Sequence, residues 1–147
     1  MRLSPCLAIG LAILIGATTA QAKDKSGAAL FERQDPAFAT MTLSREGEDW
    51  RLSIRAAGLP DGAATAADCE IVAIGTQDAD DLITAYVVPF EGELVSVTEE
   101  DIGPDNLTIA VQIGPEGAFA TDHGAAAKLC GMGSDISGFY QRMDTPE

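Results

Sequence analysis

Alternation of apolar and polar side chains is the feature that most constrains how this chain can fold. In residues 50–55 every second side chain is apolar, and the same pattern returns in residues 107–113. A period of two is typical of a β-strand with one buried face. A glycine turn at residues 46–48 and the sequence Gly-Pro-Glu-Gly at 114–117 adjoin these segments. We therefore expect two hairpins. Their partner strands are expected at residues 38–44 and 118–121.

Further short strands are expected from segments rich in Val, Ile and aromatic residues. They cover residues 70–74, 82–88, 93–97 and 139–143. About seven or eight short strands, with a turn signal roughly every 8 to 12 residues, predict an all-β fold, either a small antiparallel β-barrel or a sandwich. The alternative is an α+β domain in which a helix begins at residues 125–129. Gly131 and Gly133 would end that helix almost at once.

The N-terminal residues have the pattern of an export signal. A short basic start is followed by an apolar segment at residues 7–15 and by small residues up to Ala22. The apolar segment is shorter than the roughly 20 residues that a membrane span requires. We expect a signal peptide at residues 1–22, a flexible lead at 23–36 and one β domain at 37–147. The mature chain is expected in the periplasm, without insertion into the membrane.

Two of the three cysteines would remain after export, because Cys6 lies in the predicted signal peptide. In an oxidising compartment Cys69 and Cys130 are expected to form a disulfide, which would stabilise the fold by roughly 4 kcal/mol. Two separate buried thiols are the alternative. A metal site would need more sulfur or imidazole than a chain with one histidine offers, so no metal or other cofactor is expected.

The charge of the chain is strongly one-sided, with 23 acidic and 9 basic side chains and a formal net charge of −14. No Lys or Arg occurs between Arg55 and Lys128. Such a field disfavours nucleic acid and speeds encounters with basic proteins or cations. The acidic clusters at residues 78–81 and 99–101 lack the EF-hand spacing and are interpreted as solvated loops.

Residues 130–140 form the most unusual local sequence, since three glycines and a cysteine occur within eleven residues. If Cys130 is held to the core, this segment can be a stiff loop that projects from the barrel. The alternative is a glycine-rich connection to a last strand in which Tyr140 only packs.

The sequence Ser137-Gly138-Phe139-Tyr140 resembles the Ser-Gly-x-x-Tyr loop motif of the bacterial periplasmic lysozyme inhibitors. Tyr stands one position earlier here, and Gln141 occupies the family's position. The resemblance covers these four residues, together with size, export, a disulfide and strand content. It implies that the loop enters a glycosidase cleft. Ser137 and Tyr140 would approach the two catalytic carboxyl groups, Gly138 would let the backbone pass closely, and Phe139 would add apolar contact.

On this basis the chain is expected to be a non-enzymatic inhibitor of a basic lysozyme or lytic transglycosylase. A module that binds a small ligand or a divalent cation at the mouth of the barrel is the alternative, and an envelope assembly factor is a third. A hydrolase would have to combine His123 and Asp122 with Ser134 or Ser137. The sequence around Ser134 lacks the G-x-S-x-G pattern, so no catalytic residue is expected.

Overall fold

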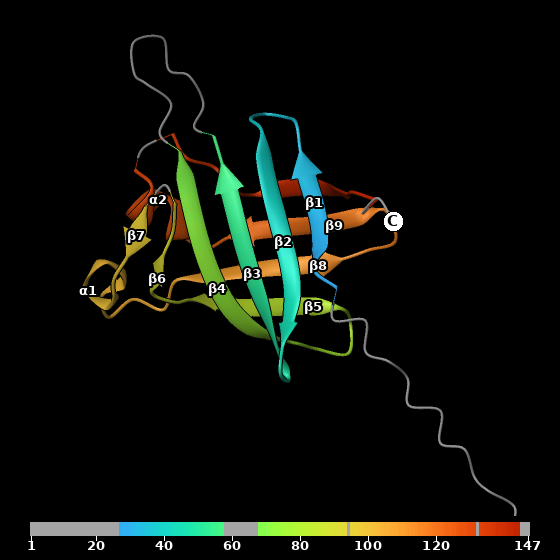
Figure 1. Ribbon diagram of the computed structural model, residues 1–147, viewed down its shortest axis with the longest axis horizontal. Helices are drawn as coiled ribbons and strands as arrows, with labels where there is room; N and C mark the ends of the chain where they lie inside the picture. Colours follow the sequence, from blue (N-terminus) through green and yellow to red (C-terminus); the bar gives the residue numbers. More distant parts are fainter. Residues whose placement is uncertain (1–26, 58–67, 94, 132, 145–147) are drawn as a thin grey trace, which may run out of the picture.

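Eight antiparallel strands close into a β-barrel in the computed structural model, which describes residues 27–57, 68–93, 95–131 and 133–144 (Figure 1). The barrel strands are β1 (Ala29–Arg33), β2 (Ala39–Glu46), β3 (Asp49–Ala56), β4 (Cys69–Gln77), β5 (Leu82–Val87), β8 (Thr108–Ile113), β9 (Gly117–Asp122) and β10 (Gly138–Arg142). Around the barrel their order is β1, β10, β9, β8, β5, β4, β3 and β2. The predicted all-β barrel is confirmed.

Both predicted hairpins are present. Strands β2 and β3 pair from Ala39 opposite Ala56 to Glu46 opposite Asp49, and Gly47 turns the chain with a φ of 69°. Strands β8 and β9 pair on either side of the turn at residues 114–116. Each hairpin joins strands that are close in the sequence, so local alternation and turn residues were enough to locate them.

The predicted flexible lead at residues 23–36 is wrong for its second half. Residues 29–33 form β1, which pairs with β2 on one side and β10 on the other and so closes the barrel. Phe31 and Arg33 are buried there, which explains why this polar-looking segment is ordered. The predicted signal peptide at residues 1–22, and residues 23–26 of the lead, lie outside the described residues.

The strand predicted at residues 93–97 is also corrected. Two short strands, β6 (Phe90–Glu91) and β7 (Ser96–Val97), form a small separate sheet, and the helix α1 (Glu99–Ile102) follows them. The helix considered at residues 125–129 exists as α2 (Ala125–Leu129), but it is a single short turn beside the barrel. It does not change the fold class.

Side chains fill the interior of the barrel. The largest fully buried residues come from β1, β2, β3, β4, β5, β8 and β10 and from the segment before β10; they include Phe31, Met41, Leu43, Leu52, Ile54, Ile71, Ile83, Ile109, Ile136 and Tyr140. Among the described residues, no helix is long and apolar enough to cross a membrane. The packed interior leaves the outer wall and the connections between strands as the surfaces on which a partner can act.

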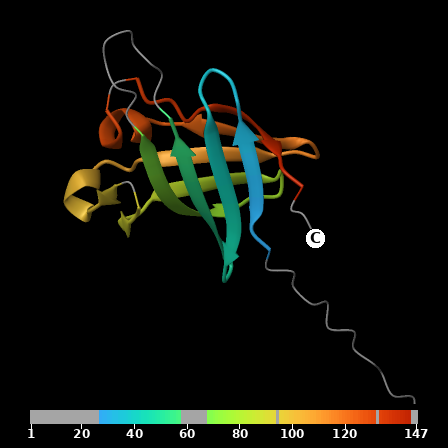
Figure 2. The same ribbon diagram turned by 45° about the horizontal axis from the view of Figure 1, so that its top comes forward.

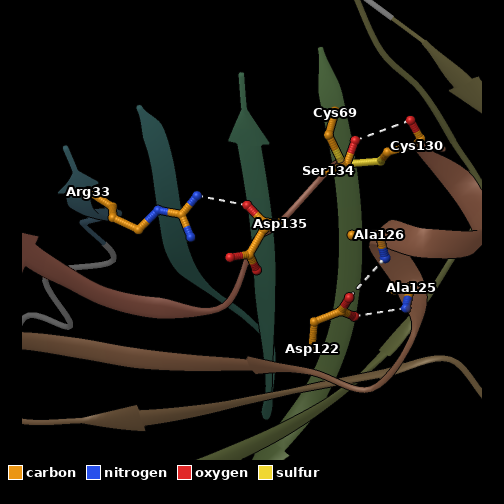
Figure 3. The surroundings of a disulfide bond; sticks show 8 residues. All are labelled: Arg33, Cys69, Asp122, Ala125, Ala126, Cys130, Ser134 and Asp135. Atoms are coloured by element: carbon orange, nitrogen blue, oxygen red, sulfur yellow. Dashed lines mark hydrogen bonds between the residues drawn. A yellow bond between two sulfur atoms is a disulfide. The ribbon is translucent and has the colours of Figure 1, made fainter. Parts of the chain in front are cut away.

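The disulfide predicted between Cys69 and Cys130 is confirmed, with the two Cα atoms 5.1 Å apart. It joins the start of β4 to the residue that ends α2 (Figure 3). Figures 1 and 2 show both helices and the β6–β7 sheet at the same end of the barrel. This end therefore carries the long connections, whereas short turns close the opposite end.

Candidate functional site

The motif Ser137-Gly138-Phe139-Tyr140 lies along the barrel wall. Gly138, Phe139 and Tyr140 belong to β10, where they pair with Ala120, Phe119 and Ala118 of β9. The prediction of a projecting loop is therefore wrong, and the alternative of a glycine-rich connection to a last strand is confirmed. The physical reason is closure of the barrel, since β10 supplies the hydrogen-bonding edge that joins β9 to β1.

Arg33 fixes the segment that leads into β10. Its guanidinium donates hydrogen bonds to the backbone carbonyl oxygens of Ser137, Asp135 (2.7 Å) and Ala37 (3.2 Å). Figure 3 shows the bond to Asp135. The residue is only 2% exposed, and its guanidinium carbon lies 5.4 Å from the centre of the Tyr140 ring. Carbonyl dipoles and an aromatic face thus stabilise a buried cation.

The half-buried Ser137 links this segment to Asp122, the last residue of β9. Its Oγ accepts a hydrogen bond from the backbone N–H of Asp122 at 3.0 Å. The Asp122 carboxylate in turn accepts hydrogen bonds from the N–H groups of Ala125 (2.8 Å) and Ala126 (3.1 Å), as Figure 3 shows. Ser137 therefore supports Asp122, whose carboxylate caps the start of α2.

Tyr140 is fully buried, and its hydroxyl donates a hydrogen bond to the carbonyl oxygen of Ile136 at 2.8 Å. Burial raises the pKa of the Tyr140 phenol to about 12. Gly138 precedes it with a φ of 129° and packs near Arg33. A partner cannot reach the Tyr140 hydroxyl while the barrel is closed, so the target-binding role expected for this residue has no geometric basis here.

Phe139 is the exposed member of the motif. It is 52% exposed and pairs across the strands with Phe119, which is 51% exposed. The Phe139 ring lies over Gly117, where a Cβ would stand 2.7 Å from its Cζ. The rings of Phe119 and Phe139, together with the two shallow hollows that border Phe139, form what we call the β9–β10 aromatic face.

Two shallow hollows flank Phe139. One has a volume of about 260 Å³ and is lined by Pro115, Glu116 and Phe119 among others. The other measures about 330 Å³ and includes Glu32 and Asp35. Carboxylates therefore stand on both sides of an apolar centre. This arrangement suits a partner that presents apolar groups surrounded by basic ones.

The aromatic face could have been found from the sequence. Phe119 stands between Ala118 and Ala120, which point inward on β9, so it occupies a position where alternation calls for a polar side chain. Phe139 occupies the equivalent position beside the inward-pointing Tyr140. An aromatic residue at an outward position is the signal that the sequence interpretation missed.

The other candidate residues have structural roles. Asp78 accepts hydrogen bonds from the N–H groups of Asp80 and Leu82, and Asp101 caps α1 through Thr98. The Ser134 hydroxyl donates to the carbonyl oxygen of Cys130. Within the described ranges, no three His, Cys, Asp or Glu side chains are grouped so as to hold a metal ion. Asp78, Asp101 and Ser134 therefore have structural roles.

In comparisons with protein-family models, curated proteins and solved structures, none matches this chain. The functional interpretation therefore depends on the geometry of the surface. The most distinctive surface of the described residues is the β9–β10 aromatic face, because it combines two half-exposed phenyl rings with flanking carboxylates on a rigid sheet.

Proposed function

We propose that this protein is a non-enzymatic, exported inhibitor that covers the substrate cleft of a basic lysozyme-like peptidoglycan hydrolase with its β9–β10 aromatic face. The observation that carries the proposal is the pair of half-exposed phenyl rings, Phe119 and Phe139, between acidic hollows on a chain with a net charge of −14. The resemblance of residues 137–140 to the lysozyme inhibitor motif suggests the class of partner.

The position of the rings supports tight docking. Both belong to paired strands, so little conformational entropy is lost when a partner binds. Aromatic side chains that become buried on binding dominate the energy of many interfaces. About half of the surface of Phe119 and of Phe139 is exposed and could be buried by a partner. The acidic surroundings would steer a basic enzyme to this face and speed association.

The proposed contact differs from insertion of a hydroxyl-bearing tip. Ser137 and Tyr140 bond to backbone groups of the barrel, and Phe139 is the motif residue most exposed to a partner. Inhibition would then arise because the convex barrel wall blocks access of the sugar polymer to the cleft. The small-ligand alternative gains no support from the geometry, since side chains occupy the barrel interior.

A turbidity assay tests the proposal with basic lysozymes, lytic transglycosylases and variants of this protein. Phe139→Ser should weaken inhibition by at least about tenfold, because it removes a central aromatic anchor. Tyr86→Ser is the matched control, since Tyr86 is 53% exposed on β5, away from the aromatic face. That control should change inhibition by less than about twofold. Full activity of every hydrolase in a large molar excess of wild-type protein would refute the proposal.

A further inference from the structure

The connection between β5 and β8 is much longer than barrel closure requires. Its described residues, 88–93 and 95–107, contain β6, β7 and α1 and fold outside the barrel wall (Figure 1). The neighbouring strands β8 and β9 are joined by a short turn. Long connections in compact domains are commonly functional. We call residues 88–107 the appendage.

The appendage is held in place by the two basic residues that border the acidic stretch of the sequence. Arg55 forms an ion pair with Glu93 at 2.9 Å. Lys128 pairs with Asp105 at 2.7 Å and also donates a hydrogen bond to the carbonyl oxygen of Ile102 at 2.7 Å. The appendage is thus fixed from both the β3 side and the α2 side, which favours a preorganised binding surface.

A hollow of about 400 Å³ lies on the appendage. Pro89, Phe90 and Val97 give it an apolar lining, and Val97 is only 5% exposed. Glu91 and Glu99 stand at the same hollow. Within the described part of the chain, no hydrogen bond or ion pair engages either of these two carboxylates. An apolar hollow is therefore combined with two carboxylates that are available to a partner.

We propose that this hollow receives a single Arg or Lys side chain from a basic polypeptide segment. The alkyl stem would lie along Val97 and Phe90, and the cationic group would meet Glu91 and Glu99. The ring of Phe90 adds a favourable surface for a guanidinium or ammonium group. Ser96 and Thr98 also line the hollow, but among the described residues no three His, Cys, Asp or Glu side chains are grouped so as to hold a metal ion. The apolar lining beside the two carboxylates therefore favours an organic cation.

This contact is separate from the β9–β10 aromatic face. The hollow is formed by the connection between β5 and β8, whereas the aromatic face lies on β9 and β10. The inference does not depend on a hydrolase as the partner. It holds for any basic polypeptide that presents an accessible Arg or Lys.

NMR titration tests the inference with the blocked tripeptide Gly-Arg-Gly as the probe. At low ionic strength, its addition to ¹⁵N-labelled protein should shift the amide signals of residues 90–91 and 96–99 most strongly. The matched tripeptide with citrulline in place of Arg, which has the same shape and no charge, should bind at least about tenfold more weakly. Glu91→Gln with Glu99→Gln should likewise raise the Kd for the Arg peptide about tenfold.

The control variant is Glu48→Gln with Asp80→Asn, which removes the same charge from exposed turns after β2 and β4. It should change the Kd by less than about twofold. Equal weakening by both double variants would contradict the inference, because it would mean that the peptide responds to net charge alone. Equal binding of the citrulline peptide, or signal shifts spread over the acidic surface, would also overturn it. None of these outcomes bears on inhibition of a hydrolase.

Discussion

At the scale of single residues, Arg33 and Tyr140 explain why the motif before and within β10 is structural. The Arg33 guanidinium donates hydrogen bonds to the backbone carbonyl oxygens of residues 37, 135 and 137. The ring of Tyr140 packs against the same guanidinium. Buried polar groups are expensive to leave without partners, so the two side chains fix residues 135–140 together. Phe139 is carried on this framework and points outward because its neighbour points inward.

The raised pKa of Tyr140 predicts a loss of stability at alkaline pH. The folded protein holds the phenolic proton up to about pH 12, whereas an unfolded phenol releases it near pH 10. This contribution is complete below about pH 10 and is lost as the pH rises toward 12. Linkage gives a loss of about 1 kcal/mol in the free energy of unfolding by about pH 11.

Urea denaturation at several pH values measures the free energy of unfolding. Absorbance titration of a Tyr86→Phe variant, in which Tyr140 is the remaining tyrosine, measures the pKa of the Tyr140 phenol. Tyr140→Phe serves as the control, because it should lose about 1 kcal/mol at neutral pH from the missing hydrogen bond and should lack the alkaline component. A phenolate that forms with a midpoint near pH 10 in the folded Tyr86→Phe protein would contradict the burial of Tyr140.

At the scale of the elements, close approach of neighbouring strands depends on glycine at defined positions. A Cβ on Gly75 of β4 would stand 1.9 Å from the backbone oxygen of Thr84 on β5. Backbone atoms in a paired strand cannot move away cheaply. The contact between β4 and β5 therefore requires the absence of a side chain at this position.

Gly75→Ala should destabilise the protein by about 3 kcal/mol or more, because the strands must separate to admit the methyl group. Gly114→Ala is the matched control, since the nearest atom to a Cβ there is 3.6 Å away, and its effect should stay within about 0.5 kcal/mol. Urea denaturation followed by circular dichroism measures both. Equal stability of the Gly75→Ala variant and the wild type would show that β4 and β5 are not packed as described.

Hairpins were predictable from the sequence because their two strands and the turn are local. The pairing of β1 with β10 was not, since it joins residues near opposite ends of the chain and has no local pattern. The same limit affected the candidate site. The motif at residues 137–140 could be recognised in the sequence. Its place in the barrel wall depends on a hydrogen bond from Arg33, which lies more than a hundred positions away in the sequence.

At the scale of the whole molecule, the basic residues are used mainly to hold the barrel and its appendage. Arg51, Arg55 and Lys128 each form an ion pair with a carboxylate, and Arg33 is buried. Many acidic side chains remain on the surface without a basic neighbour in the described residues. Carboxylates border both apolar surfaces, the β9–β10 aromatic face and the appendage hollow, and favour basic partners at each.

Fluorine NMR with 4-fluorophenylalanine tests the central claim most directly, because the chain has five phenylalanines in distinct environments. On addition of an inhibited basic lysozyme, the signals of Phe119 and Phe139 should shift. The signal of the buried Phe31 should stay unchanged, as should that of Phe38, which is 48% exposed before β2. Phe90 reports separately on the appendage. If a complex forms while the Phe119 and Phe139 signals stay in place, the β9–β10 aromatic face is not the inhibitory surface.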